Sequence, residues 1–157
     1  MMKSTLLVVE DDEAILHLID VALTMSYYKV IKAKTGREAD FRIRTEHPDI
    51  ILLDLGLPDI DGLSLIKRLR ECVDTPIIVI SARTEEETIV KALDYGANDY
   101  MTKPFNIDEL QARIRVALRV SKRPDTMQNN FENGPLIIDF SGNSVYMMGQ
   151  AILLSPY

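Results

Sequence analysis

Four acidic residues, the sequence EDDE that begins at Glu10, follow directly after an apolar run at residues 5–9. Asp54 stands in the same position after a second apolar run, at residues 49–53. In a parallel sheet these ends meet at one edge, and two carboxylates about 4 Å apart repel by roughly 4 kcal/mol at an effective dielectric constant near 20. Mg²⁺, which suits a few carboxylates plus water molecules, relieves such repulsion. The spacing therefore predicts that Glu10, Asp11 and Asp54 bind Mg²⁺.

A hydroxyl group and an ammonium group follow two further apolar runs. Ser81 comes after residues 76–80, and Lys103 comes after residues 99–102. A phosphoryl group in transfer carries charge on its equatorial oxygens, and its catalysis is mainly positioning and electrostatic stabilisation. The cation, Ser81 and Lys103 can each take one of these oxygens. This leaves Asp54 as the nucleophile that forms an aspartyl phosphate.

Two other phosphate-handling interpretations fit less well. A nucleotide-binding domain needs a glycine-rich turn after the first strand, where EDDE would instead repel a phosphate that lacks a metal. A phosphatase with an aspartyl intermediate usually has a second acid two residues after the nucleophile, and that place is Gly56. The sequence thus favours a protein that holds a phosphoryl group over one that turns over many substrates. Taken singly, Ser81 is an ordinary turn residue and Lys103 an ordinary surface charge, so the hypothesis depends on convergence.

The elements that position these residues alternate between short apolar strands and amphipathic helices. Five strands are predicted, at residues 5–9, 28–33, 49–53, 76–80 and 99–102. The first, third and fourth are apolar throughout, which is typical of a parallel sheet covered on both faces. Five strand–helix units in about 120 residues predict a doubly wound α/β domain with a five-stranded parallel sheet.

Apolar stripes and helix ends indicate the helices between these strands. One stripe consists of Ile15, Leu18, Ile19, Ala22 and Met25, and another of Leu110, Ile114, Ala117 and Leu118. Both have the spacing of an amphipathic helix. The third helix is predicted at about residues 60–72, and Gly96 is expected to end the fourth.

Capping signals mark where several of these helices should begin. The capping-box spacing, or its Asn variant, occurs at Thr35 with Glu38, at Thr84 with Glu87 and at Asn106 with Glu109. Asp12 and Glu13, the second half of EDDE, are expected to serve the start of the first helix. Glu10 and Asp11, the first half of EDDE, then remain as the predicted metal ligands.

Composition excludes several classes of protein. The chain has 157 residues and a formal charge of −6, which argues against nucleic-acid binding over its whole surface. The single Cys72 rules out an internal disulfide framework, and no Cys/His spacing suggests zinc. The apolar start is too short for a signal peptide, and no apolar run reaches membrane-spanning length. We therefore expect a soluble cytoplasmic protein.

The composition changes near residue 120. Residues 121–135 are polar, contain two prolines and suggest a linker. Residues 136–157 contain three short strand-like runs separated by turn residues, which predict a small antiparallel β segment. About twenty residues of hairpins cannot bury a core, so we interpret them as the first strands of an incomplete second domain that follows a first domain at residues 1–120.

Four sequence segments carry a resemblance to a known family. In chain order they are VVEDDEAI, IILLDLGLPDIDGLSLI, PIIVISAR and GANDYMTKPF. Together they resemble the receiver domain of two-component response regulators of the OmpR/PhoB subfamily, over residues 5–120. Within it, the segments DLGLPD, SAR and ELQARIRVALR are most similar to regulators of the Kdp potassium-uptake operon. The resemblance implies the flavodoxin-like fold of CheY.

The resemblance also implies a role for each matching residue. Asp54 matches the phospho-acceptor, and Lys103 matches the lysine that contacts the phosphate before a typically cis proline. Glu10 and Asp11 match the acidic pair that binds Mg²⁺, and Gly56 would add its backbone carbonyl. The family assists its own phosphorylation and dephosphorylation but is not a class of enzyme with external substrates.

The resemblance further implies a switch and an interface. Ser81 matches the switch hydroxyl and Tyr100 the switch aromatic, which would turn inward after phosphorylation. The implied dimer face, formed by the fourth helix, fifth strand and fifth helix, contains Ile89, Lys91, Leu93, Asp94, Asp99, Glu109, Arg113 and Arg119. The chain has Ile89 where the subfamily usually has a lysine, and Asn98 where it usually has an acid. Two of three usual interface ion pairs are therefore not expected here.

The functional hypothesis is a phosphorylation switch that controls transcription. A sensor histidine kinase would phosphorylate Asp54, and the activated protein would form a homodimer. Residues 136–157 resemble the strands that precede a winged-helix DNA-binding domain, so promoter DNA would be bound through an effector domain whose recognition helix is absent from this chain. One alternative is a stand-alone receiver that regulates a protein partner without DNA. Another is a Mg²⁺-dependent phosphoester hydrolase, against which Gly56 counts.

Overall fold

The computed structural model describes residues 3–121, and the predicted linker and antiparallel β segment lie outside these described residues. Strands and helices alternate along the described chain. The elements are β1 (Thr5–Val9), α1 (Glu13–Met25), β2 (Lys29–Ala33), α2 (Gly36–Glu46), β3 (Ile50–Leu53), α3 (Gly62–Arg70), β4 (Ile77–Ser81), α4 (Glu86–Tyr95), β5 (Asp99–Thr102) and α5 (Ile107–Ser121). All five predicted strands and the five helices that follow them are confirmed, with ends that shift by one or two residues.

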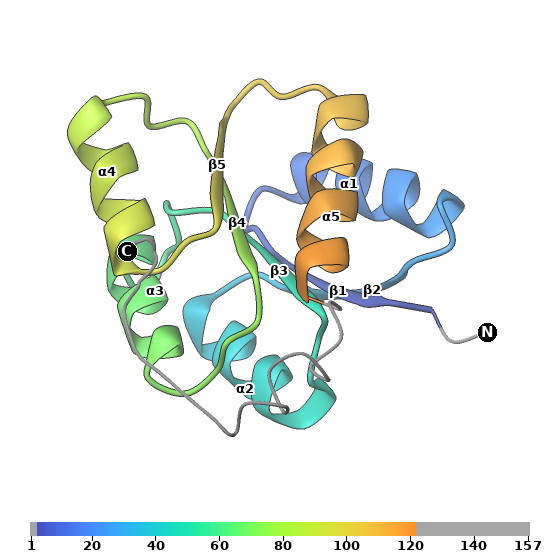
Figure 1. The fold of residues 1–157 in the computed structure, drawn as a ribbon, viewed down its shortest axis with the longest axis horizontal. Helices are drawn as coiled ribbons and strands as arrows, with labels where there is room; N and C mark the ends of the chain where they lie inside the picture. The colour runs from blue at the N-terminus through green and yellow to red at the C-terminus, as the bar shows by residue number, and fades with distance from the viewer. Residues whose placement is uncertain (1–2, 122–157) are drawn as a thin grey trace. The chain divides into compact units, whose positions relative to one another are not determined.

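The five strands form one parallel sheet in the order β2-β1-β3-β4-β5. Helices α1 and α5 cover one face, and α2, α3 and α4 cover the other (Figure 1). Alternate residues of each strand point to opposite faces, so Leu6 and Val8 join one apolar cluster while Leu7 and Val9 join the other. The order reverses direction between β1 and β3, which is where this fold places its ligands.

Helix starts agree with the capping signals in three of four places. Asp12 accepts from the backbone N–H of Ala14 and Ile15, and Thr35 accepts from Glu38. Asn106 accepts from the N–H of Glu109.

The prediction at Thr84 is wrong. Helix α4 begins at Glu86, and its N-cap residue, Glu85, forms no capping hydrogen bond through its side chain. Glu86 and Glu87 in the first turn still interact favourably with the positive N-terminal end of the helix dipole. No side-chain cap, however, satisfies the first N–H groups of the helix. This end of α4 is therefore held less firmly than the starts of α1 and α2.

The predicted apolar stripe of α1 overlaps its buried face only in part. Leu16, Ile19 and Leu23 are buried against the sheet, whereas Leu18 is 51% exposed and Met25 is 75% exposed. Helix α1 contains more apolar residues than one face can hold, so periodicity alone selected a stripe shifted around the helix. In α5 the predicted Leu110 and Ile114 are buried.

No helix within residues 3–121 is long and apolar enough to cross a membrane. The helix that Gly96 was expected to end does end there, since Gly96 is the C-cap residue of α4 with φ of 128°. A positive φ of this size favours glycine, which explains the residue type at this turn.

Candidate functional site

Three carboxylates meet where β1 and β3 end. Val9 pairs with Leu53 in the sheet, so Glu10 and Asp54 are the residues that directly follow this pair. The N–H of Asp54 donates to the carbonyl of Val9 at 2.9 Å and keeps the two strand ends together. One oxygen from each of Glu10, Asp11 and Asp54 lies within 4.8 Å of the others. The structure thus brings together the three acids that the sequence predicts as metal ligands.

Burial differs among these acids. Glu10 is 2% exposed and Asp54 is 7% exposed, whereas Asp11 is exposed to solvent. The Glu10 carboxylate accepts a hydrogen bond from the N–H of Asp12 at 3.1 Å, which ties the acidic site to the N-cap residue of α1. The site therefore has a buried floor and an open side where water molecules can complete a coordination shell.

Lys103 supplies one positive charge to this site. It follows β5 directly, and its Nζ lies 2.9 Å from Glu10 Oε1 and 3.5 Å from Asp54 Oδ1. Its backbone N–H donates to the carbonyl of Ser81, which fixes the end of β5 against β4. The following peptide bond, to Pro104, is cis. One ammonium group thus lies between two of the three carboxylates.

The pKa values of two groups reflect this crowding. Burial raises the pKa of Glu10, and the negative charge of Asp54 raises it further, although hydrogen bonds from Lys103 and the Asp12 N–H oppose the effect. Burial by itself lowers the pKa of Lys103, but the hydrogen bond to Glu10 and the charge of Asp54 outweigh it and raise that pKa. A single lysine does not balance the acids, so the site favours a further cation.

Ser81 and Gly56 lie at the sides of the site. Ser81 ends β4, is 1% exposed, and its Oγ accepts from the N–H of Arg83 at 3.0 Å. Gly56 is exposed, and a Cβ built on it would lie 3.9 Å from Asp54 Oδ2. The backbone of Gly56 also forms an isolated bridge with Asp61, which holds the loop between β3 and α3. Gly56 therefore lies close to Asp54, and Ser81 lies at the end of the strand that pairs with β3.

Tyr100 is connected to the site through Arg83. Its ring packs partly buried against an apolar cluster, and its hydroxyl donates to the Arg83 carbonyl at 2.8 Å. The Arg83 guanidinium pairs with Asp61 at 3.2 Å, which joins the loops that follow β3 and β4. The sequence pattern does not identify Asp61 as part of this arrangement. Its position just before a helix suggests capping, but its side chain does not cap α3.

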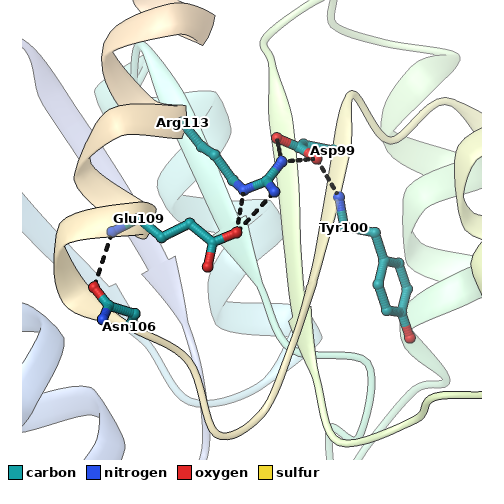
Figure 2. Close-up of polar contacts among 5 residues, drawn as sticks. All are labelled: Asp99, Tyr100, Asn106, Glu109 and Arg113. Carbon is teal, nitrogen blue, oxygen red and sulfur yellow. Dashed lines mark hydrogen bonds and ion pairs between the residues drawn. The ribbon is translucent and has the colours of Figure 1, made fainter.

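The predicted interface residues lie on α4, β5 and α5, and several are already paired within the chain. Arg113 of α5 donates to both oxygens of Asp99 in β5, at 2.9 and 2.8 Å, and to Glu109 one turn away (Figure 2). These hydrogen bonds raise the pKa of Arg113. Lys91 pairs with Glu87 on its own helix at 3.4 Å.

The remaining predicted interface residues are more open. Asp94 and Arg119 are exposed, Ile89 is half-buried, and Leu93 is 43% exposed. The side-chain oxygen Oδ1 of Asn98 accepts from the N–H of Ile77 and from Arg70. The face therefore combines internally paired charges with exposed apolar side chains.

Comparison with known proteins agrees with this geometry. Residues 6–115 match the family model described as the response regulator receiver domain. The chain is 57% identical to the transcriptional regulatory protein KdpE of Staphylococcus aureus over 155 residues, which cover 99% of this chain and 67% of that protein. It is 39% identical to the KDP operon regulator KdpE of Escherichia coli, covering 98% of this chain and 68% of that protein.

Solved structures show the same fold. A CheY-like receiver domain from Methanospirillum hungatei superimposes with a TM-score of 0.74 at 29% identity, covering 77% of this chain and 98% of that one. The beryllofluoride-activated receiver domain of Klebsiella pneumoniae RstA gives 0.72 at 33% identity, covering 74% and 99%. The chain therefore belongs to the response regulators, and its described residues form the receiver domain of a KdpE-like transcriptional regulator.

Proposed function

We propose that Asp54 accepts a phosphoryl group from a sensor histidine kinase in the cytoplasm. The observation that carries this proposal is the position of the Asp54 carboxylate, beside Lys103 and within 4.8 Å of two further acids. In the transfer, an Asp54 oxygen attacks phosphorus, the bond from phosphorus to the kinase's histidine nitrogen breaks, and the imidazole leaves. Lys103 and Ser81 would contact the oxygens of the incoming group.

We further propose that Mg²⁺ is held by Glu10, Asp11 and Asp54, with the backbone carbonyl of Gly56. The donor set is made of oxygens, as Mg²⁺ requires, and exposed Asp11 leaves room for the water molecules that this ion retains. When bound, the ion would supply positive charge that stabilises the charge developing on the phosphoryl oxygens. Glu10 and Asp11 would act by orienting it, and Lys103 would neutralise the acids that remain.

Phosphorylation would then act on the switch through Arg83. The Ser81 hydroxyl accepts from the Arg83 N–H, and the Tyr100 hydroxyl donates to the Arg83 carbonyl, so one residue lies between both switch side chains. Movement of Ser81 toward a phosphoryl group would release the Arg83 N–H and reposition this loop. Because Tyr100 already lies against the apolar cluster, we propose that phosphorylation stabilises this inward arrangement and does not create it.

The output would be a homodimer through the face of α4, β5 and α5. The relatives are named as transcriptional regulators, and the chain spans about two thirds of their length. We propose that the whole protein controls transcription through an effector domain that binds promoter DNA, with residues 136–157 as its first strands. The kinase and the second copy are the partners of the described domain.

Labelling with acetyl phosphate tests the central proposal. The wild-type chain with Mg²⁺ should gain one phosphoryl group, and Asp54→Asn should gain none, because an amide oxygen is a poor nucleophile. Adding a chelator should abolish labelling of the wild type. Asp59→Asn is a suitable control, since Asp59 is a nearby acid whose carboxylate caps α2 and takes no part in the acidic cluster. Equal labelling of wild type and Asp54→Asn would contradict the proposal.

A further inference from the structure

The end of α4 is held by cations from another helix. The last turn of α3 contains three basic residues, whereas the last turn of α4 contains none. Arg70, the final residue of α3, donates through Nε to the carbonyl of Gly96, the C-cap residue of α4, at 2.9 Å. Lys67 places its Nζ 5.1 Å from the centre of the Tyr95 ring, at the last residue of α4. Two of the three cations therefore contact the C-terminal end of α4, where a helix dipole favours positive charge.

Arg70 also joins this helix end to the strands beneath it. Its Nη1 donates to the carbonyl of Val73 at 3.1 Å, and its Nη2 donates to the Asn98 side chain at 2.8 Å. The same Asn98 oxygen accepts from the N–H of Ile77, the first residue of β4. Asn98 immediately precedes β5, so one guanidinium links the end of α3, the start of β4 and the connection from α4 to β5.

The contact between Arg70 and Gly96 is close. A Cβ on Gly96 would lie 2.3 Å from Arg70 Cγ, so the arginine stem occupies the space that any other residue would need. No carboxylate within residues 3–121 forms an ion pair with Arg70, and Asp74 acts on it only at longer range. Burial lowers the pKa of Arg70 to about 10. A partly desolvated cation held by neutral oxygens is costly, which indicates that its position serves the connection it holds.

The other end of α4 is held much less firmly. Among its ten residues, all of which the structure describes, Ala92 alone is buried. No side chain caps its N-terminus, which connects through residues 82–85 to Ser81 at the phosphorylation site. The helix thus has one tethered end and one weakly packed end, and the weakly packed end is the one connected to the site.

We propose that Arg70, assisted by Lys67, anchors the C-terminal end of α4, so that α4 pivots about that end when Asp54 is phosphorylated. Arg70 is a positioning residue in this scheme, because it touches neither the phosphoryl group nor the metal ligands. It keeps the start of β5, and with it Asp99 and Tyr100, in place while the N-terminal end of α4 moves. This inference rests on the proposed function, since it assumes that Asp54 is the phosphorylated group.

Hydrogen exchange measured with and without beryllofluoride and Mg²⁺ tests the anchor. Beryllofluoride takes the place of a phosphoryl group, and the protein is kept at a concentration where sedimentation shows a monomer. In the wild type, activation should change exchange in residues 82–89 and leave the amides of Gly96, Ala97 and Asn98 unchanged. In Arg70→Met, which keeps the apolar stem, activation should change exchange at those three amides by about threefold or more.

Arg68→Met is the matched control. Arg68 is a cation in the same turn of α3, but it makes neither of the two contacts with α4. This variant should behave as the wild type does. If Arg70→Met does not fold, Arg70→Lys, which keeps the charge but loses the planar fork, should show the same change at a smaller size.

Three results would overturn the inference. The first is an equal rise in exchange at Gly96, Ala97 and Asn98 with and without activation in Arg70→Met, which is the mark of a purely stabilising residue. The second is a match between the folded Arg70 variants and the wild type. The third is a change in the wild type at these amides as large as the change in residues 82–89. Acetyl-phosphate labelling of each variant distinguishes a failure of the anchor from a failure of the proposed function. Loss of labelling in the wild type contradicts both proposals, whereas intact labelling with any of the three results contradicts the anchor alone.

Discussion

Lys103 is a single positive charge shared by Glu10 and Asp54, at 2.9 and 3.5 Å. The third acid, Asp11, has no such partner within residues 3–121. Burial, with a smaller contribution from the charge of Asp54, raises the pKa of Glu10 above its ordinary value of 4.5. The folded domain without metal therefore stores electrostatic repulsion at one edge of its sheet. A bound divalent cation removes that repulsion, so the site couples metal binding to stability.

We predict that Mg²⁺ stabilises the domain and that the effect depends on pH. At a concentration a hundred times Kd, the free energy of unfolding should rise by about 2.7 kcal/mol. Because the folded pKa of Glu10 is raised, the metal-free fold holds a proton that the unfolded chain loses above pH 4.5, so this group's contribution falls as pH rises through the folded pKa. The metal needs the deprotonated form, so its stabilising effect should grow with pH over the same window.

Thermal unfolding with and without Mg²⁺ between pH 4.5 and 8 measures this effect. Glu10→Gln cannot titrate, and it should flatten the part of the pH dependence that Glu10 causes and weaken metal binding. Lys91→Met, which removes a cation that pairs with Glu87 on α4, should leave the effect intact. A Mg²⁺ shift that is the same in wild type and Glu10→Gln at every pH would contradict this assignment.

The two residues that lie two positions beyond Asp54 and Ser81 should influence loss of the phosphoryl group. Arg83 and Asp61 form an exposed pair that joins the loops that follow β3 and β4, and such pairs contribute about 0–1 kcal/mol. We predict that Arg83→Ala opens the path of the attacking water and speeds dephosphorylation by up to about fivefold. A bulkier polar residue at Gly56, such as Gly56→Asn, should also change the rate, since its side chain would point toward Asp54.

Decay of the labelled protein gives these rates directly. Asp61→Ala breaks the same ion pair, so the double variant should be no faster than either single variant. Additive effects would show that Arg83 acts without Asp61. Unchanged rates in both Arg83→Ala and Gly56→Asn would refute the proposed water path.

At the scale of elements, the helices differ in how their first turns are secured. Thr35 caps α2, whereas the same residue type at Thr84 does not cap α4, which begins two residues later. We predict that Thr35→Ala lowers the free energy of unfolding by about 1 kcal/mol. Thr84→Ala should change it by less than about 0.5 kcal/mol. Denaturant unfolding of the two variants compares them, and an equal loss in both would show that Thr84 does support α4 after all.

This difference connects the elements to the switch. A helix whose N-terminus is capped and whose face is buried resists displacement, whereas α4 has one buried residue and no side-chain cap. Helix α4, which residues 82–85 connect to Ser81, thus has a start that is secured only weakly. Its tethered end at Gly96 then decides how that movement reaches β5.

At the scale of the whole molecule, the charges of the proposed dimer face are largely paired within one chain. Arg113 is occupied by Asp99 and Glu109, and Lys91 pairs on its own helix. We predict that the activated dimer depends on apolar contact and that Leu93→Asp weakens it by about tenfold or more. Its dissociation constant should change by less than about threefold between low and high salt, since few charges are left to pair across the interface.

Sedimentation with beryllofluoride over a range of salt concentrations measures this. Leu18→Asp is the matched control, because it places the same change on α1, another exposed apolar position outside the α4–β5–α5 face. A strictly monomeric activated chain at tens of micromolar would contradict the dimer. A dimer that weakens steeply with salt would contradict its apolar character.

The strands and the site residues at their ends could be predicted from the sequence more reliably than the details of the helices. Strand runs such as residues 5–9 and 76–80 are strongly apolar, and both form strands as expected. Glu10, Asp54 and Lys103 could be predicted to lie together without knowledge of strand order. The reason is that all parallel strands end at the same edge of the sheet. The predicted start of α4 is wrong and the predicted face of α1 is only partly correct, since each depends on a local sequence pattern that two arrangements satisfy almost equally.

The sequence by itself determined the alternation of strands and helices, the acids at the strand ends and the resemblance to a receiver domain. These depend on local periodicity and on motifs that are contiguous in the chain. Only the tertiary structure decided that Arg83 pairs with Asp61, and that Arg70 reaches Gly96 and Asn98. Such contacts join residues 22 to 28 positions apart, and their geometry depends on how α3, α4 and the sheet pack. No pattern within one element records that packing, because it arises only when several elements bury their faces together.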